Sequence, residues 1–313
     1  MSISSQPGNP VLQQKFPLRR INPVPAPVTV QVLDDKYFSG MRNEFTSERF
    51  ELLREFVTRI KNPGLYGTYE DEKHFLDTYD FFLMSTDETR HRGFFLLREI
   101  IARQGLCARM LDVGPGSGLI TKWIGNRFDE VTVVDPNAEA IKSISAGKIR
   151  KRTRLRAIHG QIEDVILEND YYDLGLLSHV FYYLDYSRWL EVTQQVYDSV
   201  RLHGKVVVVL NGDQYGKANM IRWFRGKSIN IEPFIAGCSY LFPNSDVRVF
   251  TSVEYARAPT LDAMLHIAGF FLYDVGATAT REQLVDYVEQ FHRNRNGTYS
   301  MRFMQKFIVI SRK

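Results

Sequence analysis

The chain has 313 residues, of which 44% are hydrophobic and 13% are aromatic, as in ordinary globular proteins. Its formal net charge of +4 is too small, for this length, to indicate binding to nucleic acid. The sequence contains no run of about 18 apolar residues, and prolines stand near its start in place of the apolar segment of a secretory signal. We therefore expect a cytoplasmic protein with no membrane or nucleic-acid partner.

Neither the cysteines nor the basic residues form a ligand-binding pattern. Cys107 and Cys238 lie far apart, which fits a reducing compartment without disulfides and gives no metal-binding spacing. The densest basic stretch, residues 148–156, has no interleaved aromatic residues that would stack on bases. We interpret this stretch as a solvated connection, and we expect no metal site.

The N-terminal third divides into an arm and a group of helices. Six prolines fall within residues 1–30, and because proline interrupts both helices and sheets, this segment is predicted to be an extended or disordered arm. Apolar residues then recur at helical spacing over residues 50–60, 70–84 and 94–101. Residues 31–105 are therefore predicted to form an N-terminal helical cap.

From residue 106 onward, short apolar strands alternate with helices. This alternation is typical of α/β proteins, in which helices cover both faces of a parallel sheet. Residues 211–259 break the alternation with scattered aromatic residues, and we predict that they form a substrate-side insertion over the active face of a core spanning residues 106–313. Strands are expected at residues 110–113, 131–135, 155–159, 174–178, 206–210, 270–275 and 307–310.

The most informative segment begins at Met110, where an apolar run reaches Asp112 and is followed by Gly114, Gly116 and Gly118. Glycine has no Cβ and tolerates positive φ, so a strand, a glycine turn and a helix start in this order let the backbone approach a ligand closely. The dinucleotide fingerprint needs a longer final gap to seat a pyrophosphate. The spacing here instead resembles motif I of the S-adenosylmethionine-dependent methyltransferases, whose cofactor carries no phosphate. A tight turn without a ligand is the alternative.

Asp135 ends the second expected strand, 21 positions after Gly114. An acid at this distance can accept hydrogen bonds from both ribose hydroxyls of a bound nucleoside. The alternative is a structural acid at a helix entry, because Pro136 and Asn137 follow it. Joined to the glycine turn, the spacing favours cofactor binding.

Two later loops reach the edge where open α/β sheets bind their ligands, at the carboxyl ends of the strands. In this fold class the loop after the third strand flanks the adenine, and Gln161 and Ile162 suit that place. Ser178 and His179 follow the fourth strand and are expected to line the cleft. The alternative for His179 is a hydrogen-bonded structural histidine. No Asn/Asp-Pro-Pro-aromatic sequence occurs, which argues against planar amides and nucleobases as substrates.

The order of these motifs resembles the class I methyltransferases over residues 108–313, and a narrower similarity to the histamine N-methyltransferase family covers most of the chain. The narrower similarity is carried by residues 75–87, 133–139, 179–184 and 307–310. The class I resemblance implies a Rossmann-like sheet of seven strands, mostly parallel with the last antiparallel. It also implies S-adenosyl-L-methionine as the cofactor.

The narrower resemblance implies substrate contacts as well. Asp87 would face the substrate amine, His179 would replace a substrate-contacting glutamine, and Tyr183 belongs to the matching tyrosine pair. The sequence departs from the family here, because aspartate is one methylene shorter than the family's glutamate and residues 301–306 lack the family's asparagine. The alternative for Asp87 is an acid that only complements the dipole of its helix.

We therefore expect a methyltransferase (EC 2.1.1.-) that uses S-adenosylmethionine to methylate the nitrogen of a small amine or imidazole-like molecule. Asp87 or His179 would accept the proton that the amine must lose before attack. Two alternatives stay open, because the motifs define the cofactor and not the acceptor atom. They are a small-molecule O- or C-methyltransferase of specialised metabolism and a catalytically silent cofactor-binding scaffold. The sequence leaves the oligomeric state open.

Overall fold

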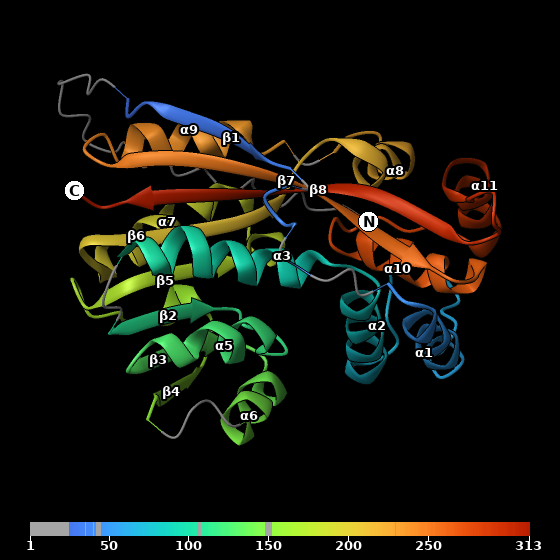
Figure 1. Ribbon diagram of the computed structural model, residues 1–313, viewed down its shortest axis with the longest axis horizontal. Helices are drawn as coiled ribbons and strands as arrows, with labels where there is room; N and C mark the ends of the chain where they lie inside the picture. The colour runs from blue at the N-terminus through green and yellow to red at the C-terminus, as the bar shows by residue number, and fades with distance from the viewer. Residues whose placement is uncertain are drawn as a thin grey trace, which may run out of the picture.

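Eight strands of the computed structural model form one sheet, in the order β1-β7-β8-β6-β5-β2-β3-β4 (Figure 1). All strand pairs are parallel except the two that β8 makes, with β6 and with β7. This confirms the predicted α/β class with a mostly parallel sheet and an antiparallel last strand, although the described sheet has eight strands and not the predicted seven. The structure describes residues 25–34, 36–39, 41, 45–104, 108–147, 152–228 and 230–313.

The strand order reverses direction next to β2, at the centre of the sheet. From β2 the chain adds β3 and then β4 on one side, and β5 returns to the other side of β2. Such a reversal opens a crevice at the carboxyl ends of the two central strands, where ligands of this architecture bind. The strands are β1 (Val28–Leu33), β2 (Arg109–Val113), β3 (Glu130–Asp135), β4 (Arg154–His159), β5 (Tyr172–Ser178), β6 (Val200–Asn211), β7 (Asp246–Ala258) and β8 (Tyr299–Ser311).

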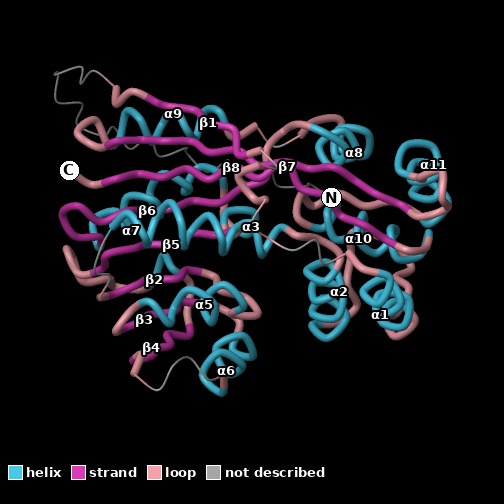
Figure 2. Tube along the Cα trace, viewed as in Figure 1, coloured by secondary structure: helices cyan, strands magenta, loops and turns pink. Residues whose placement is uncertain are grey.

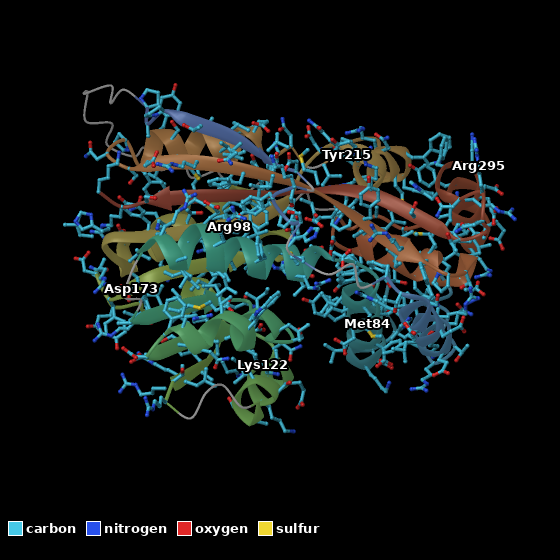
Figure 3. The ribbon with its side chains drawn as sticks, in the orientation of Figure 1. Met84, Arg98, Lys122, Asp173, Tyr215 and Arg295 are labelled. Carbon is cyan, nitrogen blue, oxygen red and sulfur yellow. The ribbon has the colours of Figure 1, made fainter. Side chains whose placement is uncertain are left out.

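The two strands that flank the crevice are joined at their opposite ends by Asp173 (Figure 3). Its buried carboxylate accepts hydrogen bonds from the backbone N–H groups of Ala108 and Arg109, at 2.8 and 2.7 Å. Bonds to a charged acceptor are stronger than bonds between neutral groups. These bonds therefore hold the starts of β2 and β5 level with each other, so that the carboxyl ends of the two strands lie side by side at one edge of the sheet.

Helices cover both faces of the sheet because its strands alternate between two apolar clusters. On β6, Val206 and Val208 pack into one cluster, and Val207 and Val209 pack into the other. One face carries α3 (Glu88–Phe95), the π-helical η1 (Leu96–Ile101), α4 (Ala102–Gln104), α5 (Leu119–Ile124) and α6 (Ala138–Ala146); the other carries α7 (Trp189–Ser199) and α9 (Glu232–Leu241). Short 3-10 turns are η2 (Gly125–Arg127), η3 (Ile162–Asp164), η4 (Phe181–Tyr183) and η5 (Tyr186–Arg188).

Strands β7 and β8 extend beyond the rest of the sheet. They pair from Asp246 with Ser311 to Ala258 with Tyr299, whereas the pairing of β6 with β8 ends at Gln305. Figures 1 and 2 show this two-stranded extension running into a group of helices at one end of the molecule. These helices are α1 (Ser47–Val57), α2 (Glu72–Met84), α8 (Tyr215–Arg225), α10 (Leu261–Tyr273) and α11 (Arg281–His292), and we refer to them together as the cap.

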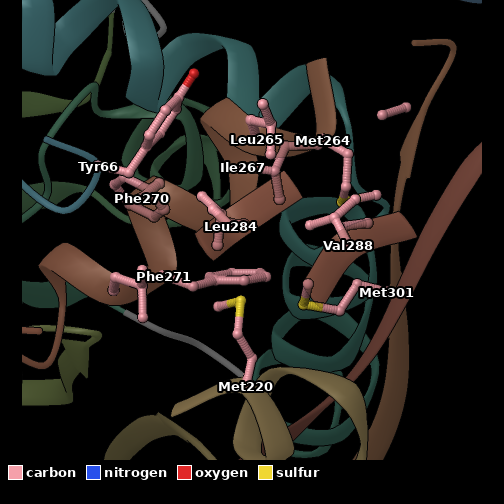
Figure 4. Close-up of a cluster of buried hydrophobic side chains, with 14 of the residues drawn as sticks. Tyr66, Met220, Met264, Leu265, Ile267, Phe270, Phe271, Leu284, Val288 and Met301 are labelled. Atoms are coloured by element: carbon pink, nitrogen blue, oxygen red, sulfur yellow. The ribbon is translucent and has the colours of Figure 1, made fainter. Parts of the chain in front are cut away.

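A single apolar core holds the cap on the extension. Met301 of β8 and Met220 of α8 lie close to Phe271 of α10 and Leu284 of α11 (Figure 4). Leu53 of α1 belongs to the same cluster. Segments from both ends of the chain therefore share one core, and the cap is not built from N-terminal residues alone.

The predicted N-terminal cap of residues 31–105 was thus only partly right. Helices α1 and α2 join the cap, but the third helix does not: Phe95 and Leu96 pack against the sheet. The end of the predicted arm also differs, because Val28–Leu33 pairs with β7 as an edge strand. Residues 1–24 of the arm and residues 148–151 of the basic stretch lie outside the described residues, as does Cys107.

The structure differs from the predictions in two places in the second half of the chain. Residues 211–259 do not form one insertion over the active face, because α8 belongs to the cap, whereas α9 covers the sheet and the 13-residue β7 is one of its strands. The strand expected at residues 270–275 is instead the end of α10, in which all residues from Ala263 to Leu272 are buried. A helix that is buried on all sides loses the 3.6-residue periodicity that marks a helix in sequence.

Within the described residues, no helix has the length and apolar character needed to cross a membrane.

The shared cap core predicts a large effect of Leu284→Ala on stability. Leu284 is fully buried, so the substitution is expected to lower the free energy of unfolding by about 2–5 kcal/mol. Leu52→Ala on α1 is the matched control, since Leu52 is 54% exposed and is expected to cost under about 1 kcal/mol. Urea denaturation measures both. Equal losses would show that the cap core does not contribute to the folded state.

Candidate functional site

A cavity of about 790 Å³ lies between the carboxyl ends of the central strands and the cap. Its floor is formed by the residues after β2, β3 and β5, and its roof by α2 and the end of α10. The cavity therefore occupies the crevice that the strand order creates, and the cap closes it from the opposite side.

The glycine turn after β2 lies directly on this cavity. Gly114, Gly116 and Gly118 have φ values of 63°, 54° and 69°, which side-chain-bearing residues rarely adopt. A Cβ at Gly114 would lie 2.6 Å from Val180, and one at Gly118 would lie 2.6 Å from Ile144, so both positions also lack space. Gly114 and Gly116 line the cavity, whereas Gly118 does not and instead begins α5.

Asp112 is buried beneath the turn and lines the cavity. Its carboxylate accepts a hydrogen bond from the Thr121 hydroxyl at 2.6 Å. Burial raises the pKa of Asp112 to about 7, and the charge of Asp135 adds to this, whereas Thr121 and Arg92 oppose it. The ligand-free cavity therefore holds an acid that is only partly ionised near neutral pH.

Asp135, at the end of β3, is hydrogen-bonded to the turn itself. Its carboxylate accepts from the backbone N–H of Gly116 at 3.2 Å and from that of Asn137 at 2.8 Å. Asn137 caps α6 in turn, by accepting from Glu139 and Ala140. Asp135 is therefore held at the cavity by both neighbouring loops, while its carboxylate still lines the open space.

The other residues predicted for the cofactor also line the cavity. Gln161 and Ile162 follow β4, and Ser178 is the last residue of β5. The Ser178 hydroxyl is buried and has no hydrogen-bond partner in the described part of the chain. A buried polar atom without a partner is costly, so this hydroxyl is available to a ligand.

His179 adopts an unusual backbone conformation at the centre of the cavity. Its φ of 58° lies in the left-handed region, although it is not glycine, and its backbone N–H donates to Val209 at 2.9 Å. Such strain is concentrated at functional sites, where the surrounding structure enforces it. The imidazole lines the cavity, and its Nε2 lies 2.7 Å from Oε1 of Glu88.

Four buried charged residues surround His179 and were not predicted from the sequence. Glu88 pairs with Arg92 at 3.2 Å, and Asp274 pairs with Lys217 at 3.1 Å. Burial would raise the pKa of Glu88, but His179, Arg92 and Lys217 lower it to about 2. Burial lowers the pKa of His179, and Arg92 and Lys217 add to this effect against Glu88. The site thus combines an ionised carboxylate with a neutral imidazole at neutral pH.

Asp87, which was predicted to face the substrate, does not line the cavity. Its carboxylate lies 3.1 Å from Arg257, with Arg49 and Arg90 at 3.8 and 3.5 Å. Glu88, the next residue along the chain, faces the cavity instead. Asp87, the acid that the family resemblance pointed to, and Glu88, the acid that lines the cavity, are therefore neighbours in sequence at the start of α3.

Tyr183 lies at the rim of the cavity and is 58% exposed. Its neighbour Tyr182 is held more firmly, because its hydroxyl accepts from the backbone N–H of Asn211 at 2.5 Å. Among the described residues, no group of His, Cys, Asp and Glu side chains is arranged to hold a metal ion.

Residues 111–208 match the family model described as a methyltransferase domain. This range runs from β2 to β6 and contains the glycine turn, Asp135 and His179. No curated protein matches the chain. Helices α1, α2, α8, α10 and α11 lie outside the matched range, so the match covers the cofactor side of the cavity and not its roof.

Several solved structures are similar to the chain at low sequence identity. The YcgJ protein of Bacillus subtilis is 14% identical, with 71% of this chain and 99% of that chain covered and a TM-score of 0.49. The N-methyltransferase NodS of Bradyrhizobium japonicum, solved with S-adenosylhomocysteine, is 14% identical, with 83% and 97% covered and a TM-score of 0.41. The plantazolicin methyltransferase BpumL, also solved with S-adenosylhomocysteine, is 14% identical, with 85% and 100% covered and a TM-score of 0.47.

The matched domain and the site together define the class of protein: the chain is an S-adenosylmethionine-dependent methyltransferase with a class I, Rossmann-like fold. The residues present fit this cofactor, since glycines leave the turn open, Asp135 offers carboxylate oxygens and Ser178 carries an unpartnered buried hydroxyl. The narrower resemblance to histamine N-methyltransferases is not shown by these comparisons.

The raised pKa of Asp112 predicts a specific dependence of stability on pH. Between the unfolded pKa near 4 and the folded value of about 7, the folded state holds one more proton, so stability falls as pH rises. This one group contributes at most about 1.4 kcal/mol per pH unit. Urea denaturation of the cofactor-free protein from pH 5 to pH 7 measures it. Asp112→Asn is expected to flatten that slope; an unchanged slope would contradict the raised pKa.

Proposed function

We propose that this enzyme transfers the methyl group of S-adenosylmethionine to the nitrogen of a small amine or imidazole-like molecule bound under the cap. The observation that carries the proposal is the excess of negative charge around the cavity. This excess is present on the cofactor side and on the cap side alike.

Carboxylates outnumber cations among the described residues that line the cavity. Arg92 and Lys217 are the two cations, and the ring of His179 is neutral at neutral pH. S-adenosylmethionine carries one net positive charge, so its binding leaves the lining negative even if Asp112 stays protonated. A cationic acceptor is therefore favoured electrostatically over an anionic one. The seven carboxylates are Asp71, Asp80, Glu88, Asp112, Asp135, Glu139 and Asp274.

Aromatic rings from the cap cover the same space. Phe82 of α2 stacks on Phe270 of α10, with ring centroids 4.8 Å apart. Tyr79 reaches from α2 toward the glycine turn, and its hydroxyl lies 3.5 Å from the Cβ position of Gly116. Aromatic faces attract cations, most strongly where water is excluded. The aromatic lining consists of Tyr69, Phe75, Tyr79, Phe82, Tyr182, Tyr183, Phe270 and Tyr273.

The cofactor side of the proposal follows the chemistry of the residues in place. Asp135 would bind the ribose hydroxyls, Gln161 and Ile162 would contact the adenine, and the glycine turn would lie against the methionine part. Asp112 would then face positive charge, which favours its ionised form. Ser178 would supply a hydroxyl at the end of β5.

Bound S-adenosylmethionine supplies a methyl group that is already electrophilic. The chain mainly has to hold the acceptor in line, exclude water and remove a proton from an ammonium group. The cap supplies the enclosure through α2 and α10. His179 supplies the proton acceptor, because its neutral ring lines the cavity beside the buried Glu88. Asp87 has no part in this step, since three arginines surround it.

Methyl transfer to a hydroxyl oxygen is the second candidate. The neutral imidazole of His179 favours it, because such a base also accepts a proton from a phenol. The charge of the lining supports nitrogen over oxygen, since an acceptor that becomes phenolate adds a negative charge to a negative cavity. Nitrogen is therefore the better supported acceptor atom.

Removing the Asp135 carboxylate is expected to abolish measurable cofactor binding. Asp135→Ala removes the proposed ribose acceptor and the hydrogen bonds from Gly116 of the turn and from Asn137, whereas Asp135→Asn retains the shape. Calorimetric titration with S-adenosylhomocysteine should show at least about tenfold weaker binding for the asparagine variant. An unchanged affinity in either variant would remove the ribose assignment.

The acceptor class is tested by release of S-adenosylhomocysteine with matched acceptors. Aromatic and aliphatic amines, the corresponding alcohols and phenols, and the corresponding carboxylic acids are each incubated with enzyme and S-adenosylmethionine. Turnover is expected with amines or imidazoles and not with the matched acids. Turnover confined to phenols or acids would refute the nitrogen acceptor while leaving the cofactor assignment intact.

Two aspartates on α2 allow a test of the effect of the lining charge, with one serving as the control for the other. Asp80 lines the cavity, and no ion pair to it exists within the described residues, whereas Asp77 lies outside the lining and pairs with Lys73. Asp80→Asn is expected to lower kcat/KM for a cationic acceptor on the order of threefold, with a smaller effect at high salt. Asp77→Asn should leave kcat/KM unchanged. Equal effects of both variants would contradict electrostatic guidance by the lining.

A further inference from the structure

We infer that Glu88 is a positioning residue that fixes the proton of His179 on Nε2, so that Nδ1 is left to accept the proton of the methyl acceptor. The inference rests on the proposed function insofar as His179 is the proton acceptor there. It assigns a role to Glu88, whereas the sequence motifs had indicated Asp87.

The contact between the two side chains determines which ring nitrogen carries the proton. Oε1 of Glu88 lies 2.7 Å from Nε2 of His179, and the Glu88 side chain is only 4% exposed. An ionised carboxylate can only accept hydrogen bonds, so the 2.7 Å contact makes Nε2 the donor to Glu88. The side-chain nitrogen of Gln305 lies farther from Nε2, at 3.3 Å, and with the proton on Nε2 this longer contact is not a hydrogen bond. A neutral imidazole has a single N–H, and Nδ1 therefore carries the lone pair.

The remaining nitrogen of His179 is available to a ligand. Nδ1 has no hydrogen-bond partner in the part of the chain that the structure describes, and the ring lines the cavity. The side chain of His179 is 20% exposed, so it is reachable from the cavity although most of it is covered. A free lone pair on a ring that lines a ligand cavity can serve as a general base.

Both partners are fixed by their backbones. Glu88 starts α3, and its backbone N–H donates to the Thr86 hydroxyl at 2.9 Å. His179 is held in its left-handed conformation by the bond from its N–H to Val209. Arg92, one turn after Glu88, donates to Oε1 of Glu88 at 3.2 Å. The carboxylate therefore has little freedom to turn away from the ring.

The charges around His179 act in opposite directions on its protonation. Arg92 and Lys217 disfavour a charged ring, and Glu88 favours it. Asp274, at the end of α10, faces the ring and is paired with Lys217. Tyr182 and Gln305 also lie beside the ring, and the side-chain nitrogen of Gln305 is 3.3 Å from Nε2. Glu88 is thus the residue that lets the ring take a proton during turnover.

The reaction balances with His179 as a transient carrier. A proton leaves the ammonium group of the acceptor for Nδ1, and the freed nitrogen lone pair then forms the bond to the methyl carbon as the sulfur–methyl bond breaks. The products are a methylated ammonium group and a neutral thioether. The imidazolium returns its proton to water after product release, while Glu88 stays ionised throughout.

The tautomer is measured directly by nitrogen NMR of protein labelled in its histidines, with His179 assigned from the spectrum of His179→Asn. The expected result for the unmodified protein is a proton on Nε2 and none on Nδ1 at pH 7.5. A proton on Nδ1 would overturn the inference. This measurement needs neither a variant at Glu88 nor an acceptor molecule.

Glu88→Gln tests the role of the charge, because it keeps the shape and removes the negative charge. His179 is expected to titrate about one pH unit lower or more in this variant, and the acid limb of the kcat profile should move with it. The plateau of kcat should fall on the order of tenfold, with the affinity for S-adenosylhomocysteine within about twofold of that of the parent. A purely structural role would change stability and leave the titration of His179 unmoved.

Glu99→Gln is the matched control, because Glu99 is also a buried carboxylate on the same helical segment. It pairs with Tyr37 and Arg103 away from the cavity, so neither the titration of His179 nor kcat should change. If amines prove not to be acceptors, the NMR results still decide the role of Glu88 while the proposed acceptor class is given up. If amines are methylated and the proton resides on Nδ1, the proposed function stands and this inference fails.

Discussion

The pairing of β7 with β8 is the constraint on which the rest of the structure depends. Its first half belongs to the sheet, and its second half continues alone past the end of β6. Because the cap packs on this second half, the height of α2 and α10 above the glycine turn is set by one continuous strand pair (Figure 1). The cavity therefore has a floor and a roof that belong to the same rigid framework, although they come from distant parts of the sequence.

Within that framework, similar acids acquire opposite properties from their partners. Asp112 and Glu88 are both buried at the cavity, but Asp112 has only a hydroxyl for a direct partner, whereas Glu88 has Arg92 and His179. Burial raises the pKa of the first to about 7, and the charged partners lower the pKa of the second to about 2. Asp112 can therefore lose its proton when a cation binds beside it, whereas Glu88 stays ionised and can orient the imidazole of His179.

Most residues that the sequence assigned to the cofactor line one cavity, because the turn that carries them depends on local chemistry. Three alternate glycines and Asp135 define a turn whatever the rest of the chain does, and the structure places Gly114, Gly116 and Asp135 at the cavity. The substrate side depends on packing between distant segments. Successive residues of a helix point about 100° apart, so whether Asp87 or Glu88 faces the cavity is decided by how α3 lies on the sheet. Nothing local in the sequence carries that information.

The errors in the second half of the chain have a similar origin. Strand β7 alternates in the manner of a strand, but the scattered aromatic residues before it, which belong to α8 and α9, obscured the pattern. Helix α10 has no polar face because the cap encloses it, so its end was read as a strand. The strands expected at residues 131–135 and 174–178, by contrast, lie close to the observed bounds of β3 and β5.

In the proposed complex, the cofactor lies between the glycine turn and the cap, with its reactive end directed toward His179. The most direct test of this arrangement is a crystal structure of the enzyme with S-adenosylhomocysteine. We expect ribose hydroxyls on the Asp135 carboxylate and a sulfur atom that faces the space bounded by His179, Tyr79 and Phe270. A sulfur atom directed away from His179, or a ribose that does not contact Asp135, would contradict it.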